Sequence, residues 1–80
     1  MNKKQPTTEI FNEMKKIAIS IWQTYDDSYG YASEKITRIN SLDNIEDNAM
    51  VFYRMFDPVN QAKFRQEASN ETLKYIKNNQ

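Results

Sequence analysis

Glycine and proline occur only three times in the eighty residues, at Pro6, Gly30 and Pro58. Both residue types break regular secondary structure, and each of the three stands where a helix could begin or end. The segments between them carry apolar residues every three or four positions, without the strict alternation typical of strands. We therefore predict an all-α fold, a compact bundle of three to four short helices. The whole chain should form a single domain with frayed ends, at residues 1–6 and 78–80.

The first segment contains the clearest helical pattern. Thr7 or Thr8 suits the N-cap position, and Glu9 would face the positive end of the helix dipole. Residues 26–31 then form a polar sequence around Gly30, which can adopt a positive φ, so we predict a turn there. The apolar stripe of this helix consists of Ile10, Met14, Ile17 and Ile21, widened by Phe11, Ala18, Trp22 and Tyr25.

Two further helix starts lie in the middle of the chain. Ser33 can cap a short second helix that closes at residues 40–41. Asp43 and Glu46 have the spacing of a capping box, which predicts a third helix running to about Phe56. This third helix is apolar around most of its circumference, so we expect it to be buried on two sides.

The last helical segment begins at Asp57, which suits an N-cap, with Pro58 at the first helical position. Polar residues dilute the apolar pattern in the middle of this segment. Ser69 and Asn70 could restart the helix rather than continue it, and the sequence leaves both possibilities open.

Histidine and cysteine are both absent. Their absence removes the usual tetrahedral zinc ligands and the commonest acid–base and nucleophilic side chains. Asp26 and Asp27 could bind a metal ion or share a proton, but adjacent carboxylates beside a glycine are typical of a solvated turn. We expect a protein that is not an enzyme and that uses no cofactor or metal. A pocket lined by Asp26, Asp27 and another carboxylate would favour the enzyme alternative.

Charge gives no strong indication of a nucleic-acid partner. Eleven basic residues balance eleven acidic ones, and the basic residues are dispersed along the chain. Residues 33–56 could resemble a helix-turn-helix, but Glu46 and Asp47 would then repel phosphate. A weak nucleic-acid-binding accessory protein is therefore the alternative interpretation. No apolar stretch is long enough for a signal peptide or a membrane span, so we expect no membrane insertion and a cytoplasmic location.

Aromatic side chains gather around the end of the first helix, the following turn and the third helix. A chain of this length has a thin core, which cannot bury all of them. Exposed tyrosine and methionine favour an interface with another protein, and a thin core also favours self-association into a homo-oligomer. The predicted partner-binding residues are Tyr29, Tyr31, Met50, Met55 and Trp22, with core packing as the alternative for each.

Two stretches of the sequence resemble a known group of proteins. WQTYDDSYGY at residues 22–31 and NAMVFYRMFDPVNQAKFR at residues 48–65 are similar to small accessory proteins of T-even-type phages, among them the rapid-lysis family of lysis-inhibition proteins. The resemblance implies a factor in the host cytoplasm that binds the N-terminal segment of a phage holin and delays lysis. It assigns a role to no individual residue.

Overall fold

The computed structural model describes residues 7–43 and 49–80, and 71% of these residues lie in helices. They form five helices and no strand, which confirms the all-α prediction. The number exceeds the predicted three to four because the last predicted helix is divided at Ser69, and because a single turn in the middle counts as a helix. The helices are α1 (Thr8–Trp22), α2 (Tyr31–Asn40), α3 (Val51–Arg54), α4 (Pro58–Glu67) and α5 (Asn70–Asn79).

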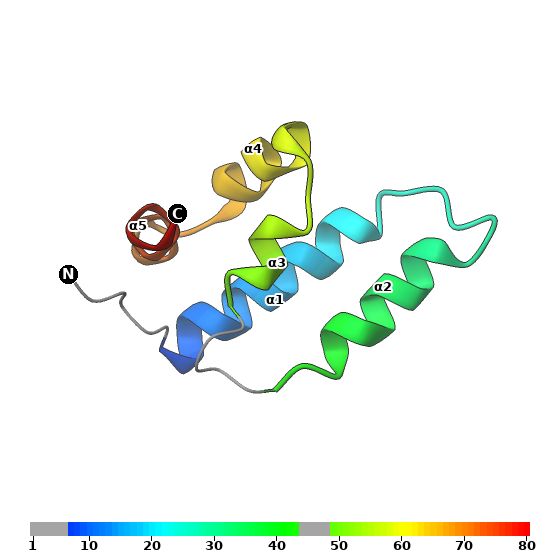
Figure 1. Ribbon diagram of the computed structural model, residues 1–80, viewed down its shortest axis with the longest axis horizontal. Coiled ribbons are helices and arrows are strands. Elements are labelled where there is room, and N and C mark those ends of the chain that lie inside the picture. Colours follow the sequence, from blue (N-terminus) through cyan, green and yellow to red (C-terminus); the bar gives the residue numbers. More distant parts are fainter. Residues whose placement is uncertain (1–6, 44–48) are drawn as a thin grey trace.

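Helix α1 is the central element and contacts each of the other four helices. Figure 1 shows α2 running back alongside α1 in the opposite direction, with α3 lying across α1. Helices α4 and α5 follow α3, and α5 is seen nearly end-on at the opposite end of the molecule from the loop that joins α1 to α2. The other four helices therefore pack around α1, which contributes its apolar side chains.

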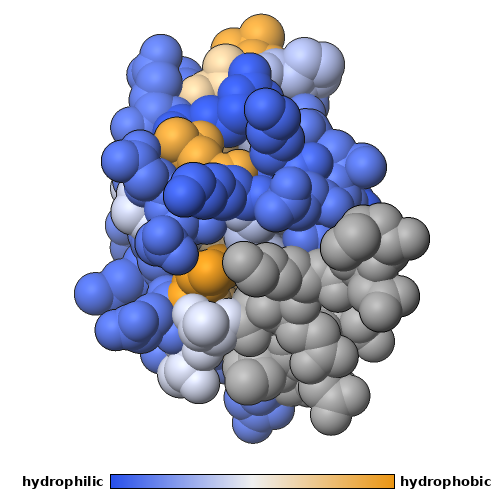
Figure 2. Space-filling model, turned by 90° about the vertical axis from the view of Figure 1, so that its left-hand side faces the viewer, coloured by the Kyte–Doolittle hydropathy of each residue, from blue (hydrophilic) through white to orange (hydrophobic). Residues whose placement is uncertain are grey.

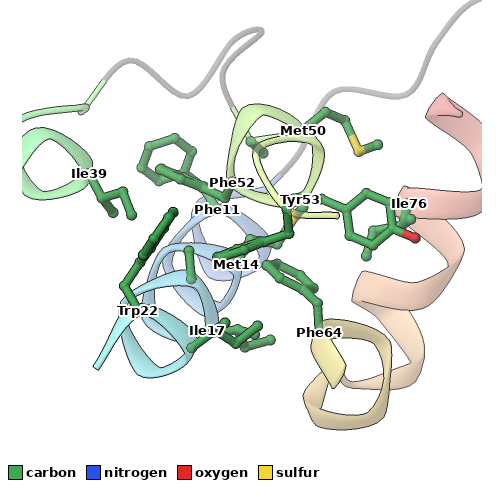
Figure 3. Close-up of a cluster of buried hydrophobic side chains, with 14 of the residues drawn as sticks. Phe11, Met14, Ile17, Trp22, Ile39, Met50, Phe52, Tyr53, Phe64 and Ile76 are labelled. Carbon is green, nitrogen blue, oxygen red and sulfur yellow. The ribbon is translucent and has the colours of Figure 1, made fainter. Parts of the chain in front are cut away.

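The predicted apolar stripe of α1 forms the centre of the core. Its buried members are Phe11, Met14, Ile17, Ala18, Ile21 and Trp22. Rings from later helices meet this stripe: Phe11 and Phe52 lie edge to face with their centroids 5.2 Å apart. Figure 3 shows Met14, Phe52, Tyr53 and Phe64 pointing into the same interior. Edge-to-face pairs add to the stabilisation from burial, so these rings fix α3 and α4 against α1.

Two predicted caps are confirmed. The Thr7 hydroxyl accepts a hydrogen bond from the backbone N–H of Ile10 at 3.1 Å. The Asp57 carboxylate accepts one from the backbone N–H of Asn60 at 2.9 Å, and Pro58 occupies the first turn of α4. Each cap satisfies an N–H group that has no partner within its own helix.

The structure shows that a new helix starts after Ser69. Ala68 has an extended backbone that ends α4, and the Ser69 hydroxyl accepts a hydrogen bond from the backbone N–H of Thr72 at 3.4 Å. Separate helices let α5 leave the direction of α4 and return to α1, which it contacts.

Ser33, in contrast, does not cap α2. This helix begins at Tyr31, directly after Gly30, whose φ of 73° lies in the left-handed region. The backbone N–H of Ser33 donates instead to the carboxylate of Asp27 at 3.0 Å. The acceptor that a cap requires therefore comes from the preceding turn, and the helix can start three residues earlier than a cap at Ser33 predicts.

The third helix is also shorter than predicted. Residues 49–50 form a turn, and α3 is the single turn Val51–Arg54. The buried residues that the prediction placed on one face, Phe52 and Tyr53 among them, are nevertheless in the core. The capping box predicted at Asp43 and Glu46 lies partly outside the described residues, as does the predicted fraying of residues 1–6.

At the C-terminal end, the structure shows a helix over most of the segment predicted to fray. Helix α5 continues to Asn79, which is only 5% exposed. The Arg54 guanidinium donates to the backbone carbonyl of Asn79 at 2.8 Å, and the Asn79 amide donates to the carbonyl of Tyr75 at 2.7 Å. A cation at the negative end of a helix dipole is stabilising, and here it is supplied by α3.

Glu13 fastens α1 to the start of α5. Its carboxylate accepts hydrogen bonds from the backbone N–H of Ser69 at 2.6 Å, the Ser69 hydroxyl at 2.8 Å and the Thr72 hydroxyl at 2.7 Å. Burial acts to raise the pKa of Glu13, but the hydrogen bonds from Thr72 and Ser69 outweigh it, and the pKa is lowered. The charged form of Glu13 is therefore the one that the fold stabilises.

Replacing Phe52 by Ala should lower the free energy of unfolding by about 3–5 kcal/mol, because the fully buried ring leaves a cavity against α1. Urea denaturation measures the loss. The matched control is Val51→Ala in the same helix turn, where the side chain is 43% exposed and the change should stay within about 0.5 kcal/mol. Equal effects of the two substitutions would contradict the burial of Phe52.

Glu13 should make stability depend on pH in a predictable direction. Its folded-state pKa lies below the ordinary value of 4.5, so its contribution is fully present above pH 4.5 and is lost as the pH falls through the lowered pKa. Urea midpoints measured from neutral pH down through this window should fall less for Glu13→Gln than for the wild type. Glu9→Gln, at an exposed position in the first turn of the same helix, should lose only a small helix-dipole contribution and should keep most of the wild-type fall. Parallel curves for all three would disprove the role of Glu13.

Candidate partner-binding surface

Two of the five predicted partner-binding residues are strongly exposed. Tyr29 is 98% exposed and Tyr31 is 55% exposed, on either side of Gly30. This confirms that the turn after α1 presents aromatic side chains to solvent. Met55, a third predicted residue, is partly buried at the C-terminal end of α3 and packs against the core.

Met50 and Trp22 are in the core, with 4% and 5% of their surfaces exposed. For these two residues the structure shows the packing alternative that the sequence left open, and their predicted exposure is corrected. Met50 precedes α3 in a turn, so the helical periodicity that placed it on an outer face does not apply. Because Met50 is buried, fewer apolar side chains remain on the surface, which weakens one reason for expecting self-association.

Hydrogen bonds within the loop hold the exposed tyrosines in place. Asp26 accepts from the backbone N–H of Ser28 at 3.1 Å and from its hydroxyl at 2.6 Å. The backbone N–H of Gly30 donates to the carbonyl of Asp27 at 3.0 Å, closing a turn just before α2. Thr24 donates to the carbonyl of Ile21 at 2.6 Å, where the loop leaves α1. The loop is therefore preorganised, and a partner would not have to order it on binding.

Asp27 joins the loop to α2. One carboxylate oxygen accepts from the Ser33 backbone N–H and the other from the Ser33 hydroxyl. These hydrogen bonds, first that of the hydroxyl and then that of the backbone, lower the pKa of Asp27. Asp27 consequently carries a negative charge at neutral pH, at an exposed position beside the tyrosines.

Tyr25 is a member of this surface that the sequence reasoning missed. The apolar stripe of α1 appeared to include it, but α1 ends at Trp22, and Tyr25 lies beyond the helix with 39% of its surface exposed. Its hydroxyl accepts a hydrogen bond from the Asn60 side chain at 2.6 Å. Burial, then the charge of Asp57 and the neighbouring Tyr31, raise the pKa of the Tyr25 phenol, so it stays neutral. We call Tyr25, Tyr29 and Tyr31 together the tyrosine surface.

Trp22 supports the tyrosine surface from below. Its ring centroid lies 4.6 Å from that of Tyr25, 5.7 Å from that of Tyr31 and 5.4 Å from that of Phe56. Its indole N–H is buried and has no hydrogen-bond acceptor in the part of the chain that the structure describes. Apolar packing therefore holds the Trp22 side chain, and the ring connects two of the exposed tyrosines to the core.

Among the residues that the structure describes, the carboxylates do not line the hollow that the enzyme alternative requires. A hollow of about 220 Å³ beside Trp22 contains Asp27 but neither Asp26 nor another carboxylate. A second hollow, of about 340 Å³, is lined by Glu9, Glu13 and Glu71, and the Glu13 oxygens are already bound by Ser69 and Thr72. Across residues 7–43 and 49–80, no group of three acidic side chains is placed to hold a metal ion.

Several basic side chains point to partners within the protein. The Lys15 ammonium donates to the carbonyls of Asn40 at 3.3 Å and Leu42 at 2.9 Å, at the end of α2. Arg65 donates to the Tyr53 hydroxyl, and Arg54 caps α5 as described above. These three cations have structural partners, so they are not free side chains of the kind that usually bind phosphate.

Comparisons of the chain with protein-family models, with curated proteins and with solved structures found no match. The tyrosine surface therefore has to be interpreted from its own geometry. The described helices are also all too short or too polar to cross a membrane.

The opposite end of the molecule differs from the tyrosine surface. Figure 2 views the side from which α5 and the start of α1 project, and most of the surface drawn there in colour is hydrophilic, with small separate hydrophobic areas. Scattered apolar spots of this kind are normal on soluble proteins, whereas exposed aromatic side chains gathered in one segment are more often part of an interface. The described surface thus has a clear candidate for a binding site at one end.

Proposed function

We propose that this protein binds another protein through the tyrosine surface and regulates or inhibits it, without catalysing a reaction. The observation that carries the proposal is the exposure of Tyr29 in the loop and of Tyr31 at the start of α2, in a segment whose backbone is held by internal hydrogen bonds. Tyrosine is enriched at the centres of interfaces because it supplies a large contact area with little loss of side-chain freedom.

The packing below the tyrosine surface supports the same interpretation. Tyr31 and Tyr25 contact the ring of Trp22, which in turn contacts Phe56. A partner that covers the exposed rings would extend the hydrophobic core outward, and the contact would bury apolar surface on a rigid support.

The resemblance to phage lysis-inhibition proteins names one partner to test first. In that case the tyrosine surface would bind the N-terminal segment of a T-even-type phage holin in the host cytoplasm, and the outcome would be delayed lysis. This specific role is a proposal that depends on the resemblance, whereas the general proposal depends on the exposed tyrosines.

Photo-crosslinking in the native cell tests the proposed surface directly. A benzophenone-bearing phenylalanine analogue at position 29 should give a specific crosslinked partner, because the side chain there projects almost completely into solvent. The same analogue in place of exposed Lys74 on α5, at the opposite end, should give none. Tyr29→Ser should then weaken binding of the identified partner by more than about 1 kcal/mol, while circular dichroism stays unchanged.

Three outcomes of this experiment contradict the proposal. They are crosslinking at position 74 but not at 29, normal partner binding by Tyr29→Ser, and crosslinking of nucleic acid in place of protein. A crosslink between two copies of the chain would identify a second copy as the partner and would support the expected self-association, which sedimentation at micromolar concentration can check.

A further inference from the structure

A hollow of about 220 Å³ opens beside the tyrosine surface, between the end of α1 and the first turns of α2. Ligand sites for drug-sized molecules typically occupy about 300–1,000 Å³, so this hollow suits one side chain better than a whole small molecule. Rings and aliphatic groups supply part of its lining, and one carboxylate stands among them. The lining residues are Trp22, Gln23, Tyr25, Asp27, Ala32, Ser33 and Ile36.

The charge around this hollow is more negative than in the rest of the molecule. Residues 23–36 contain three carboxylates, Asp26, Asp27 and Glu34, and one ammonium group, Lys35, whereas the whole chain is neutral. Asp57 adds a further carboxylate close enough to act on Tyr25. The Lys35 ammonium lies 5.1 Å from the ring centroid of Tyr31 and does not line the hollow, so it leaves Asp27 open to a cation from outside.

We propose that the hollow receives an arginine side chain from a basic segment of the protein partner. This inference rests on the proposed function, because it names the chemistry of the partner that the tyrosine surface binds. The arginine stem would lie against Ala32 and Ile36, and its guanidinium would reach the Asp27 carboxylate beside the Tyr25 and Trp22 rings.

The chemistry of the lining favours arginine over other side chains. A guanidinium is planar, stacks on aromatic rings and remains charged, and it is less strongly hydrated than an ammonium group. Both Asp27 oxygens already accept from Ser33, but a carboxylate has about four lone-pair positions and can accept further donors. Ser33 also fixes the direction of the carboxylate, so the acceptor is preorganised for a partner. An acidic side chain would be repelled by Asp27, and a large apolar one would bring no further donor to its carboxylate.

The two larger hollows are weaker candidates. The hollow of about 580 Å³ between α1 and the end of α2 is lined by charges of both signs, and its Lys15 and Glu13 are bound within the protein. The hollow with three glutamates lies where Glu13 fastens α5, which gives it a structural explanation. Of these three hollows, the one beside Trp22 combines rings and aliphatic groups with a single carboxylate, that of Asp27.

Two small probes test the inference on the intact chain. N-acetyl-arginine amide and N-acetyl-citrulline amide have nearly the same shape, but only the former is charged. Trp22 is the sole tryptophan, so its indole N–H gives a single resonance in a ¹H–¹⁵N spectrum and reports on the hollow. Titration at low salt should shift this resonance together with the amide of Ser33. The dissociation constant for the arginine probe should be about fivefold lower than for citrulline, a ratio that matches a pair of weak charge interactions.

Two matched variants locate the effect. Asp27→Asn keeps one oxygen that can accept from Ser33 but loses the charge, so the preference for arginine over citrulline should fall towards one. Asp26→Asn removes a neighbouring charge that does not line the hollow, and the preference should remain within about twofold of the wild type. Circular dichroism checks that both variants keep their helices, and the wild-type comparison of the two probes depends on no variant.

Equal binding of both probes, or an equal loss of preference in the two variants, would overturn the inference. The proposed function is tested separately, because Tyr29 does not line the hollow. If crosslinking at position 29 finds a partner but the two probes bind equally, the proposed function is supported and the proposed arginine site is disproved. If the arginine probe binds more tightly but Tyr29→Ser binds the partner normally, the proposed arginine site is supported and the proposed function is disproved.

Discussion

The burial of one face of α1 is the interaction on which the rest of the structure depends. Helix α1 contacts all four other helices, and its buried side chains meet rings from α3 and α4. A polar contact and a cluster of rings then determine the arrangement at the two ends of α1. Glu13 fastens the start of α5 near one end, and Trp22 packs against exposed and buried rings at the other. The apolar stripe of α1 ends at Trp22, and the segment after α1 folds over this ring. The tyrosine surface forms there because Tyr25 and Tyr31 pack against Trp22.

Features encoded within a few residues could be predicted from the sequence. The caps at Thr7 and Asp57, the closure of α2 at Ser41 and the buried stripe of α1 all follow from local spacing. Exposure of Tyr29 could be predicted because it lies beside the lone glycine in a polar turn. In each case the physical cause lies within about one helical turn of the residue concerned.

Features that depend on distant contacts could not be predicted in the same way. No local pattern shows that Arg54 donates to the end of a helix 25 residues later, or that Asp27 supplies the acceptor for the first turn of α2. The position of Tyr25 required knowledge that α1 ends at Trp22, and periodicity alone would have continued the stripe. The hollow beside Trp22 is formed by two helices and the loop between them, so composition indicated its aromatic character but not its shape.

The span of the Glu13 contacts has a consequence for the order of folding. The hydrogen bonds of Glu13 join residues 56 and 59 positions apart, whereas α1 and α2 pair across a short loop. Closing a long segment costs more chain entropy than closing a short one, so we expect the α1–α2 pair to form first and α5 to dock late. A contact made after the transition state mainly slows unfolding. The carboxylate of Glu13 would then act as a kinetic latch on the native state, with little influence on how fast the chain reaches it.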